Sequence, residues 1–138
     1  MRNRELAADY VQRAHVRLRA LDVLFEAGSW ADVVRESQEV LELALKGLLR
    51  ACGVDPPRIH DVADVLLAER ERLPAPVARE VDHLASLSRD LRRDRELAFD
   101  GAEDLTPSRF YREPDAVQAR EAARLVVRLV KPEVLGPD

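Results

Sequence analysis

The segment from Val33 to Cys52 constrains the fold more than any other part of the chain, because its apolar residues recur with the period of an α-helix. Consecutive side chains on an α-helix are about 100° apart, and these residues fall within about 100° of Leu41. They are Val33, Val34, Ser37, Val40, Ala44, Leu45, Leu48, Leu49 and Cys52. The segment therefore predicts an amphipathic helix that buries one broad face.

A row of polar residues interrupts this face, since Gln38, Glu42 and Lys46 occupy every fourth position of the same helix. Gln38 lies inside the apolar arc, Glu42 at its edge and Lys46 just outside it. A polar group removed from water loses free energy unless it is hydrogen-bonded. The row therefore predicts a set of matched polar partners, or a groove, beside the helix.

Helical periodicity covers most of the chain, and no useful length of strand-like alternation is present. Residues 3–27, 29–52, 61–72, 76–99 and 114–131 form five helical segments that are separated by glycine and proline breakers. The short connection at Gly28 makes the first two helices antiparallel neighbours. We expect an all-α fold, a five-helix up-and-down bundle with two long antiparallel N-terminal helices. Residues 1–131 would form one domain, and residues 132–138 a frayed C-terminal tail.

Composition excludes several classes of function. The chain has 138 residues and a net charge of −4, which argues against nonspecific nucleic-acid binding through bulk charge. One cysteine excludes an internal disulfide, and three scattered histidines do not form a metal site. The apolar runs are far shorter than the ~20 residues of a membrane span, and the start is too charged for a signal peptide. We expect a cytoplasmic protein without membrane contact, metal or cofactor.

Arg95 occupies a buried register position of the fourth predicted helix, in line with Leu91 and Ala98. A guanidinium group keeps its charge, so it must be paired or face an opening. We hypothesise that Arg95 meets Glu42 across the second and fourth helices. The alternatives are a surface ion pair, or an arginine whose stem is buried while its charge reaches water.

Arginines gather around this position and alternate with acids. The cluster contains Arg89, Arg92, Arg93 and Arg95, with Asp90, Asp94 and Glu96 between them. One interpretation is a solvated helix face whose charges nearly cancel. The other is a patch that contacts phosphate, because the arginine fork matches phosphate oxygens.

Two further residues have alternative interpretations. His60 precedes Asp61, a predicted N-cap, so it either belongs to a capping turn or lines a groove with Lys46 and Gln38. Tyr111 falls in the predicted exposed loop before the last helix, where it could accept a covalent modification. In that loop, aromatic side chains could also stack on a base or anchor the loop to the core.

Residues 37–49 followed by Ile59-His-Asp-Val62 resemble the core of HEPN domains, in which a Gln-x-x-x-Glu-x-x-x-Lys helix precedes a His-Asp turn. Residues 91–104 resemble the fourth-helix motif of one branch of small prokaryotic HEPN proteins, and the resemblance extends from Leu21 to Val130. It implies a five-helix bundle that forms a homodimer. Members are ribonucleases, toxins of toxin–antitoxin systems, or noncatalytic nucleotide- or RNA-binding partners, many of them encoded beside a minimal nucleotidyltransferase.

Ribonucleolytic members carry an arginine, four to six residues and then a histidine. Arg95 matches the arginine, but Asp100 stands near the place of the histidine and no histidine follows it. The resemblance therefore implies a noncatalytic binding module, a homodimer that binds a nucleotide, RNA or a nucleotidyltransferase-like partner. Its groove would consist of Gln38, Glu42, Lys46, His60, Arg89, Arg92 and Arg95.

Two alternatives stay open. One is a metal-independent endoribonuclease of the toxin type that uses Arg95 with Asp100 or His60. The other is a purely protein-interaction role, with Tyr111 as a modification acceptor for the partner enzyme.

Overall fold

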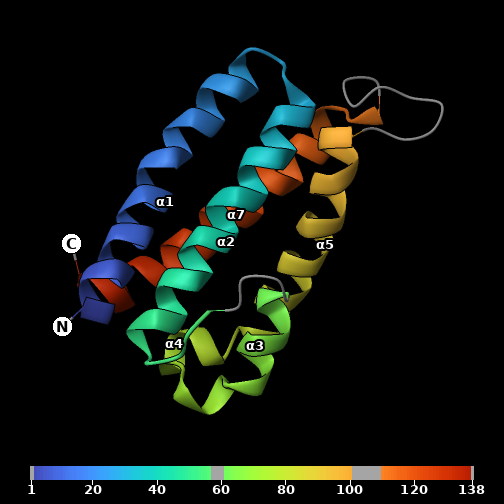
Figure 1. Cartoon of the computed structure of the whole chain (residues 1–138). Helices are drawn as coiled ribbons and strands as arrows, with labels where there is room; N and C mark the ends of the chain where they lie inside the picture. Colours follow the sequence, from blue (N-terminus) through green and yellow to red (C-terminus); the bar gives the residue numbers. More distant parts are fainter. Residues whose placement is uncertain (1, 57–60, 101–109, 138) are drawn as a thin grey trace.

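The computed structural model is an all-helical bundle, as the periodicity predicts (Figure 1). It describes residues 2–56, 61–100 and 110–137, and for Arg2 and residues 94–100 it describes the backbone alone. Within these ranges there are six α-helices and one short 3-10 helix, so the prediction of five helices is wrong in number.

The two longest N-terminal helices lie side by side and antiparallel (Figure 1). Helix α1 spans Arg2–Glu26 and α2 spans Trp30–Ala51. Gly28 has a φ of 72°, a left-handed conformation that glycine adopts without a Cβ clash, and it reverses the chain direction. The predicted antiparallel pair is therefore confirmed.

Short elements close one end of the bundle. Helix α3 spans Val62–Ala68, the 3-10 helix η1 spans Arg70–Arg72, and α4 spans Ala75–Ala78. Asp61 caps α3 as predicted, because its carboxylate accepts a hydrogen bond of 2.9 Å from the amide of Ala63.

Helix α5, Val81–Asp100, starts later than predicted. The predicted continuous helix over 76–99 is wrong, because the amide of Glu80 donates to the carbonyl of Val77, three residues back, at 2.9 Å. This tighter turn separates α4 from α5. Val77 and Val81, four residues apart on either side of this turn, are nevertheless both buried, so one apolar face continues across the break.

The last helix, α7, spans Glu113–Leu135 and passes through Pro132. The prediction that Lys131-Pro132 ends this helix is therefore wrong. Proline lacks an N–H group, so at this position it removes one helical hydrogen bond, and the amide of Gly136 still donates to the carbonyl of Pro132 at 3.1 Å. The division into residues 1–131 and a tail stays a prediction.

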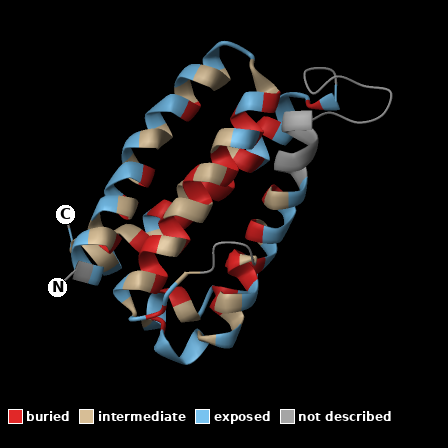
Figure 2. Ribbon diagram, viewed as in Figure 1, coloured by how far each residue is buried: buried red, intermediate tan, exposed pale blue. Residues whose placement is uncertain are grey.

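Helix α2 is the centre of the molecule and contacts α1, α5 and α7, with its buried residues toward these helices (Figure 2). Twelve of its 22 residues are buried, including Leu41, Leu45 and Leu48. The alanine-rich stripe of α7 packs against it. That stripe consists of Ala116, Ala119, Ala123, Val126 and Val130, all of them buried.

Candidate functional site: a polar groove on helix α2

The polar row of α2 is connected by its own side chains. The Nε2 of Gln38 donates a hydrogen bond to the carboxylate of Glu42, and Lys46 Nζ lies 2.9 Å from the other carboxylate oxygen. The side chain of Gln38 is buried, whereas Glu42 and Lys46 are partly exposed. The row therefore satisfies its own polar groups and presents a carboxylate and an ammonium group to solvent.

Glu42 is ionised at neutral pH. Burial raises the pKa of its carboxyl, but hydrogen bonds from Lys46 and Gln38 and the nearby charges of Lys46 and Arg92 outweigh that effect. The pKa therefore lies below its ordinary value of 4.5. Because Arg92 contributes to this shift, the structure brings α5 and the polar row close together.

A groove of about 360 Å³ opens beside the row, and we call it the polar groove. Its walls come from α1, α2 and α5. The lining residues are Arg13, Arg17, Gln38, Glu39, Glu42, Leu43, Lys46 and Arg92. Four of these side chains are cations and two are carboxylates, so the groove has a positive excess on a chain whose net charge is −4.

Several of these cations already have carboxylate partners. Arg17 Nε lies 2.8 Å from a carboxylate oxygen of Glu36, and Arg13 Nη1 lies 3.7 Å from Asp9. A negatively charged ligand would therefore exchange partners with these carboxylates. Such exposed ion pairs contribute about 0–1 kcal/mol each, so the exchange is not prohibitive.

The structure separates the predicted arginine cluster. Arg92 is half-buried and lines the polar groove beside Gln38, Glu42 and Lys46. Arg89 instead extends to Asp64 of α3, with 2.6 Å between Nη2 and the carboxylate, and is not among the residues that line the groove. Arg93 lies 4.0 Å from Asp90 on the exposed face of α5. The structure therefore does not bring Arg89 together with the row of α2, and its place in a ligand site stays a prediction.

Three predicted site residues fall outside the parts that are described. His60 belongs to an undescribed segment, and for Arg95 and Asp100 the structure describes the helical backbone without the side chain. The pairing of Arg95 with Glu42 stays a prediction.

Tyr111 is not exposed. Only 4% of its surface is accessible, and its ring packs edge-to-face on Phe110 with centroids 4.9 Å apart. The prediction of an exposed Tyr111 is wrong, because the ring anchors the start of α7 to the core. A buried hydroxyl is a poor acceptor for enzymatic modification.

Arg13 and Arg17 form the α1 wall of the polar groove, and neither was predicted as a site residue. The position of the turn at Gly28 could have revealed these two arginines. If the chain reverses near Gly28, residues equally far from that turn lie opposite one another, which places Arg17 near Glu39 and Arg13 near Leu43. The two arginines are also four residues apart and therefore share one helix face.

Two negative findings apply to the described residues. None of them gathers three or more histidine, cysteine or acidic side chains in a geometry that could hold a metal ion. In the same part of the chain, no helix has both the length and the apolar character that crossing a bilayer requires.

Fold and groove together define an α-helical bundle that carries a charged groove on a Gln-Glu-Lys row. The sequence profile of the HEPN domain matches residues 7–133, nearly the whole chain, so the chain belongs to the HEPN domain family. No curated protein and no solved structure gives a significant match.

Proposed function

We propose that this HEPN domain is a noncatalytic binding module whose polar groove holds the phosphates of a nucleotide or of single-stranded RNA. The observation that carries the proposal is the groove itself, in which three arginines from α1 and α5 surround a hydrogen-bonded Gln-Glu-Lys row whose lysine is a fourth cation. Arginine forks match phosphate oxygens, and a positive groove on an otherwise acidic chain concentrates the interaction at one place.

The remaining lining residues support a nucleotide rather than a bare anion. Leu43 offers a half-buried apolar surface within the groove. Glu42, which is ionised, can accept hydrogen bonds from ribose hydroxyls or base amino groups. We propose that Arg13, Arg17 and Arg92 contact phosphate, while Gln38 and Glu42 orient the sugar or base.

The proposed module is a homodimer. Val16 and Val23 are 50% and 66% exposed on α1, and seven residues apart they share one face of that helix. Exposed apolar positions on a long helix favour a partner chain. Light scattering at tens of micromolar should give the mass of a dimer, and a monomer would contradict this part of the proposal.

The test of the groove is fluorescence anisotropy with a labelled single-stranded RNA and with a labelled ATP analogue. Replacing Arg13 and Arg92 by Gln should weaken binding about tenfold and lower the slope of log affinity against log salt by about 2, because two phosphate contacts are lost. The matched control replaces Arg72 and Arg79 by Gln at the α3–α4 end, which removes the same charge away from the groove.

Three outcomes are informative. If both double variants lose affinity for the probes equally, the loss is explained by net charge alone, and the polar groove is rejected as the binding site. Cleaved RNA on a gel would favour the alternative endoribonuclease that uses Arg95 with Asp100 or His60. No binding of either probe, together with capture of a nucleotidyltransferase-like protein encoded nearby, would favour a protein-interaction role.

A further inference from the structure

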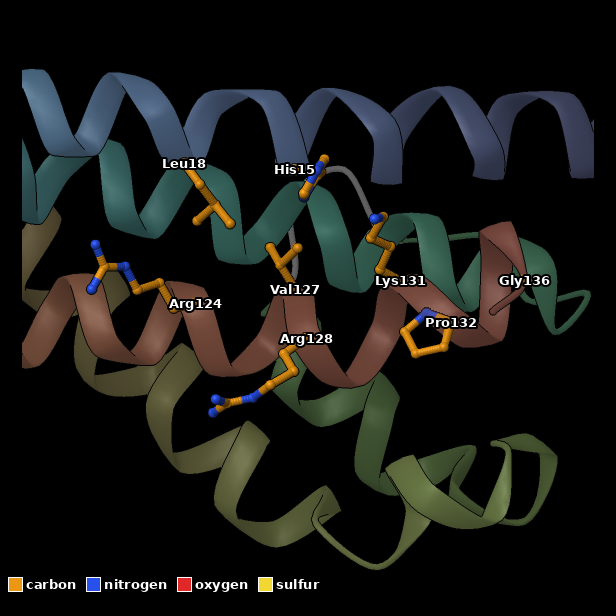
Figure 3. A pocket seen from close by; sticks show the side chains of 8 residues that line it. All are labelled: His15, Leu18, Arg124, Val127, Arg128, Lys131, Pro132 and Gly136. Carbon is orange, nitrogen blue, oxygen red and sulfur yellow. The ribbon is translucent and has the colours of Figure 1, made fainter. Parts of the chain in front are cut away.

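A second groove lies between α1 and α7, and it shares no lining residue with the polar groove (Figure 3). Its volume is about 390 Å³. Leu18 of α1 and Val127 of α7 point into the space between the two helices, and Pro132 continues this apolar floor. His15, Arg124, Arg128 and Lys131 contribute the nitrogen-bearing side chains of its rim.

This groove continues toward the ends of the chain. Pro132 and Gly136 also line a neighbouring hollow of about 540 Å³, whose other residues include Arg4, Ala8 and Val134. The two hollows together accompany α1 from Arg4 to Leu18, a length of about 21 Å at 1.5 Å per residue. We call this continuous surface the α1/α7 groove.

Most of the charged side chains in the α1/α7 groove are positive. The described residues that line it include Arg4, Arg124, Arg128 and Lys131, against the single carboxylate of Glu133. Arg124 is already compensated, since its Nη2 lies 2.8 Å from Asp22 and its Nη1 lies 3.0 Å from Glu121. Arg128 and Lys131 line the same hollow as Arg124, Lys131 has an interaction partner of its own, and Arg4 lines the neighbouring hollow together with Glu133.

We infer that the α1/α7 groove binds an extended peptide segment of a partner protein in which acidic and apolar residues alternate. In an extended segment, side chains point to opposite sides in turn, so apolar residues can face Leu18, Val127 and Pro132 while acidic residues face the rim. A groove of about 21 Å accommodates about six such residues at ~3.3 Å each.

The spacing of the cations favours a peptide over other anions. A fatty acid carries one charge at one end and needs a continuous apolar channel, whereas cationic side chains line both hollows of this groove beside the apolar ones. A nucleic acid favours stacking on aromatic rings, and the apolar floor here is aliphatic.

The test uses a fluorescein-labelled peptide of about seven residues in which glutamate and leucine alternate. Anisotropy at low salt should show saturable binding to the wild-type protein. A lysine–leucine peptide should not bind, and a glutamate–serine peptide should bind about tenfold more weakly because it lacks the apolar contacts. In the wild-type protein, NMR signals of Leu18 and Val127 should shift on titration, which needs no mutation.

The matched variants locate the binding site. Arg128→Glu with Lys131→Glu should lower peptide affinity at least about tenfold, whereas Arg72→Glu with Arg79→Glu should leave it unchanged. The inference is overturned if both double variants lose affinity equally, if the signals of Leu18 and Val127 do not shift, or if the glutamate–leucine peptide does not bind. Binding of dodecanoate or RNA to this groove in place of the peptide would also overturn it.

Discussion

Gly47 sets how closely α1 and α2 approach, and replacing it by alanine tests the geometry on which the polar groove depends. A Cβ at this position would lie 2.7 Å from Val11 Cγ2, 3.1 Å from the carbonyl oxygen of Ala7 and 3.2 Å from Tyr10 Cβ. The first distance is an overlap, and the second involves backbone that cannot rotate away. The α1 wall, with Arg13 and Arg17, would therefore be displaced from α2.

Two opposing effects determine the magnitude. Alanine in a helix interior is favoured over glycine by about 1 kcal/mol. Overpacking a close helix contact costs about 1–3 kcal/mol. We expect Gly47→Ala to lower the free energy of unfolding by about 1 kcal/mol, or the melting temperature by about 3 °C in a domain of this size.

Urea denaturation followed by circular dichroism measures this change, and a double-mutant cycle with Val11→Ala identifies its cause. Val11→Ala alone should cost about 2 kcal/mol, because Val11 is fully buried. In the double variant the overlap with Cγ2 is gone. The loss of unfolding free energy in the double variant should therefore be about 1 kcal/mol smaller than the sum of the losses in the two single variants. If Gly47→Ala raises the stability by about 1 kcal/mol, helix propensity alone acts and the close approach is refuted.

The remaining predictions concern two clusters of charged residues. Because the pKa of Glu42 is lowered in the folded state, its stabilising contribution is complete above the ordinary value of 4.5 and is lost as the pH falls through the lower folded value. Acid titration of the unfolding free energy should therefore decline less steeply for Glu42→Gln than for wild type below pH 4.5, and parallel curves would contradict the assignment. The guanidinium of Arg120 lies 3.7 Å from the centre of the Phe25 ring and 3.2 Å from Asp22. Replacing Arg120 by Ala should therefore lower the free energy of unfolding by about 1–2 kcal/mol. Exposed Arg79→Ala is its control in the same urea titration and should change the stability by less than about 0.5 kcal/mol.

The sequence was sufficient for the helical class and for most of the core, because buried side chains repeat with the helical period. The predicted arc around Leu41 is buried along α2, and its last member, Cys52, lies just beyond the end of the helix and is partly exposed. Helix boundaries were harder to predict from the sequence. The break between α4 and α5 is marked by a hydrogen bond from Glu80 to a residue only three positions back. This turn leaves the spacing of the apolar residues unchanged, so the sequence periodicity does not reveal it.

The candidate site was predictable where it lies on one helix and less so where it spans several. The Gln38-Glu42-Lys46 row follows from i to i+4 spacing alone. Arg92 and Arg89 are three residues apart on α5, yet one reaches the groove and the other reaches Asp64, because the position of α3 decides between them. Tyr111 was predicted on an exposed loop, and of the two roles considered for the aromatic side chains of that loop, its burial supports anchoring to the core.

The central position of α2 has a consequence for how the molecule opens. Three neighbouring helices cover this helix, and Gln38, the first member of the polar row, is itself buried within it. Amide hydrogens of α2 can therefore exchange with deuterium only when the whole bundle comes apart, whereas those of α3 and α4 can exchange through local fraying. We therefore expect the carboxylate and ammonium groups that face the groove to be held by the most slowly exchanging helix, so that a ligand meets a preformed surface and loses little entropy in ordering it.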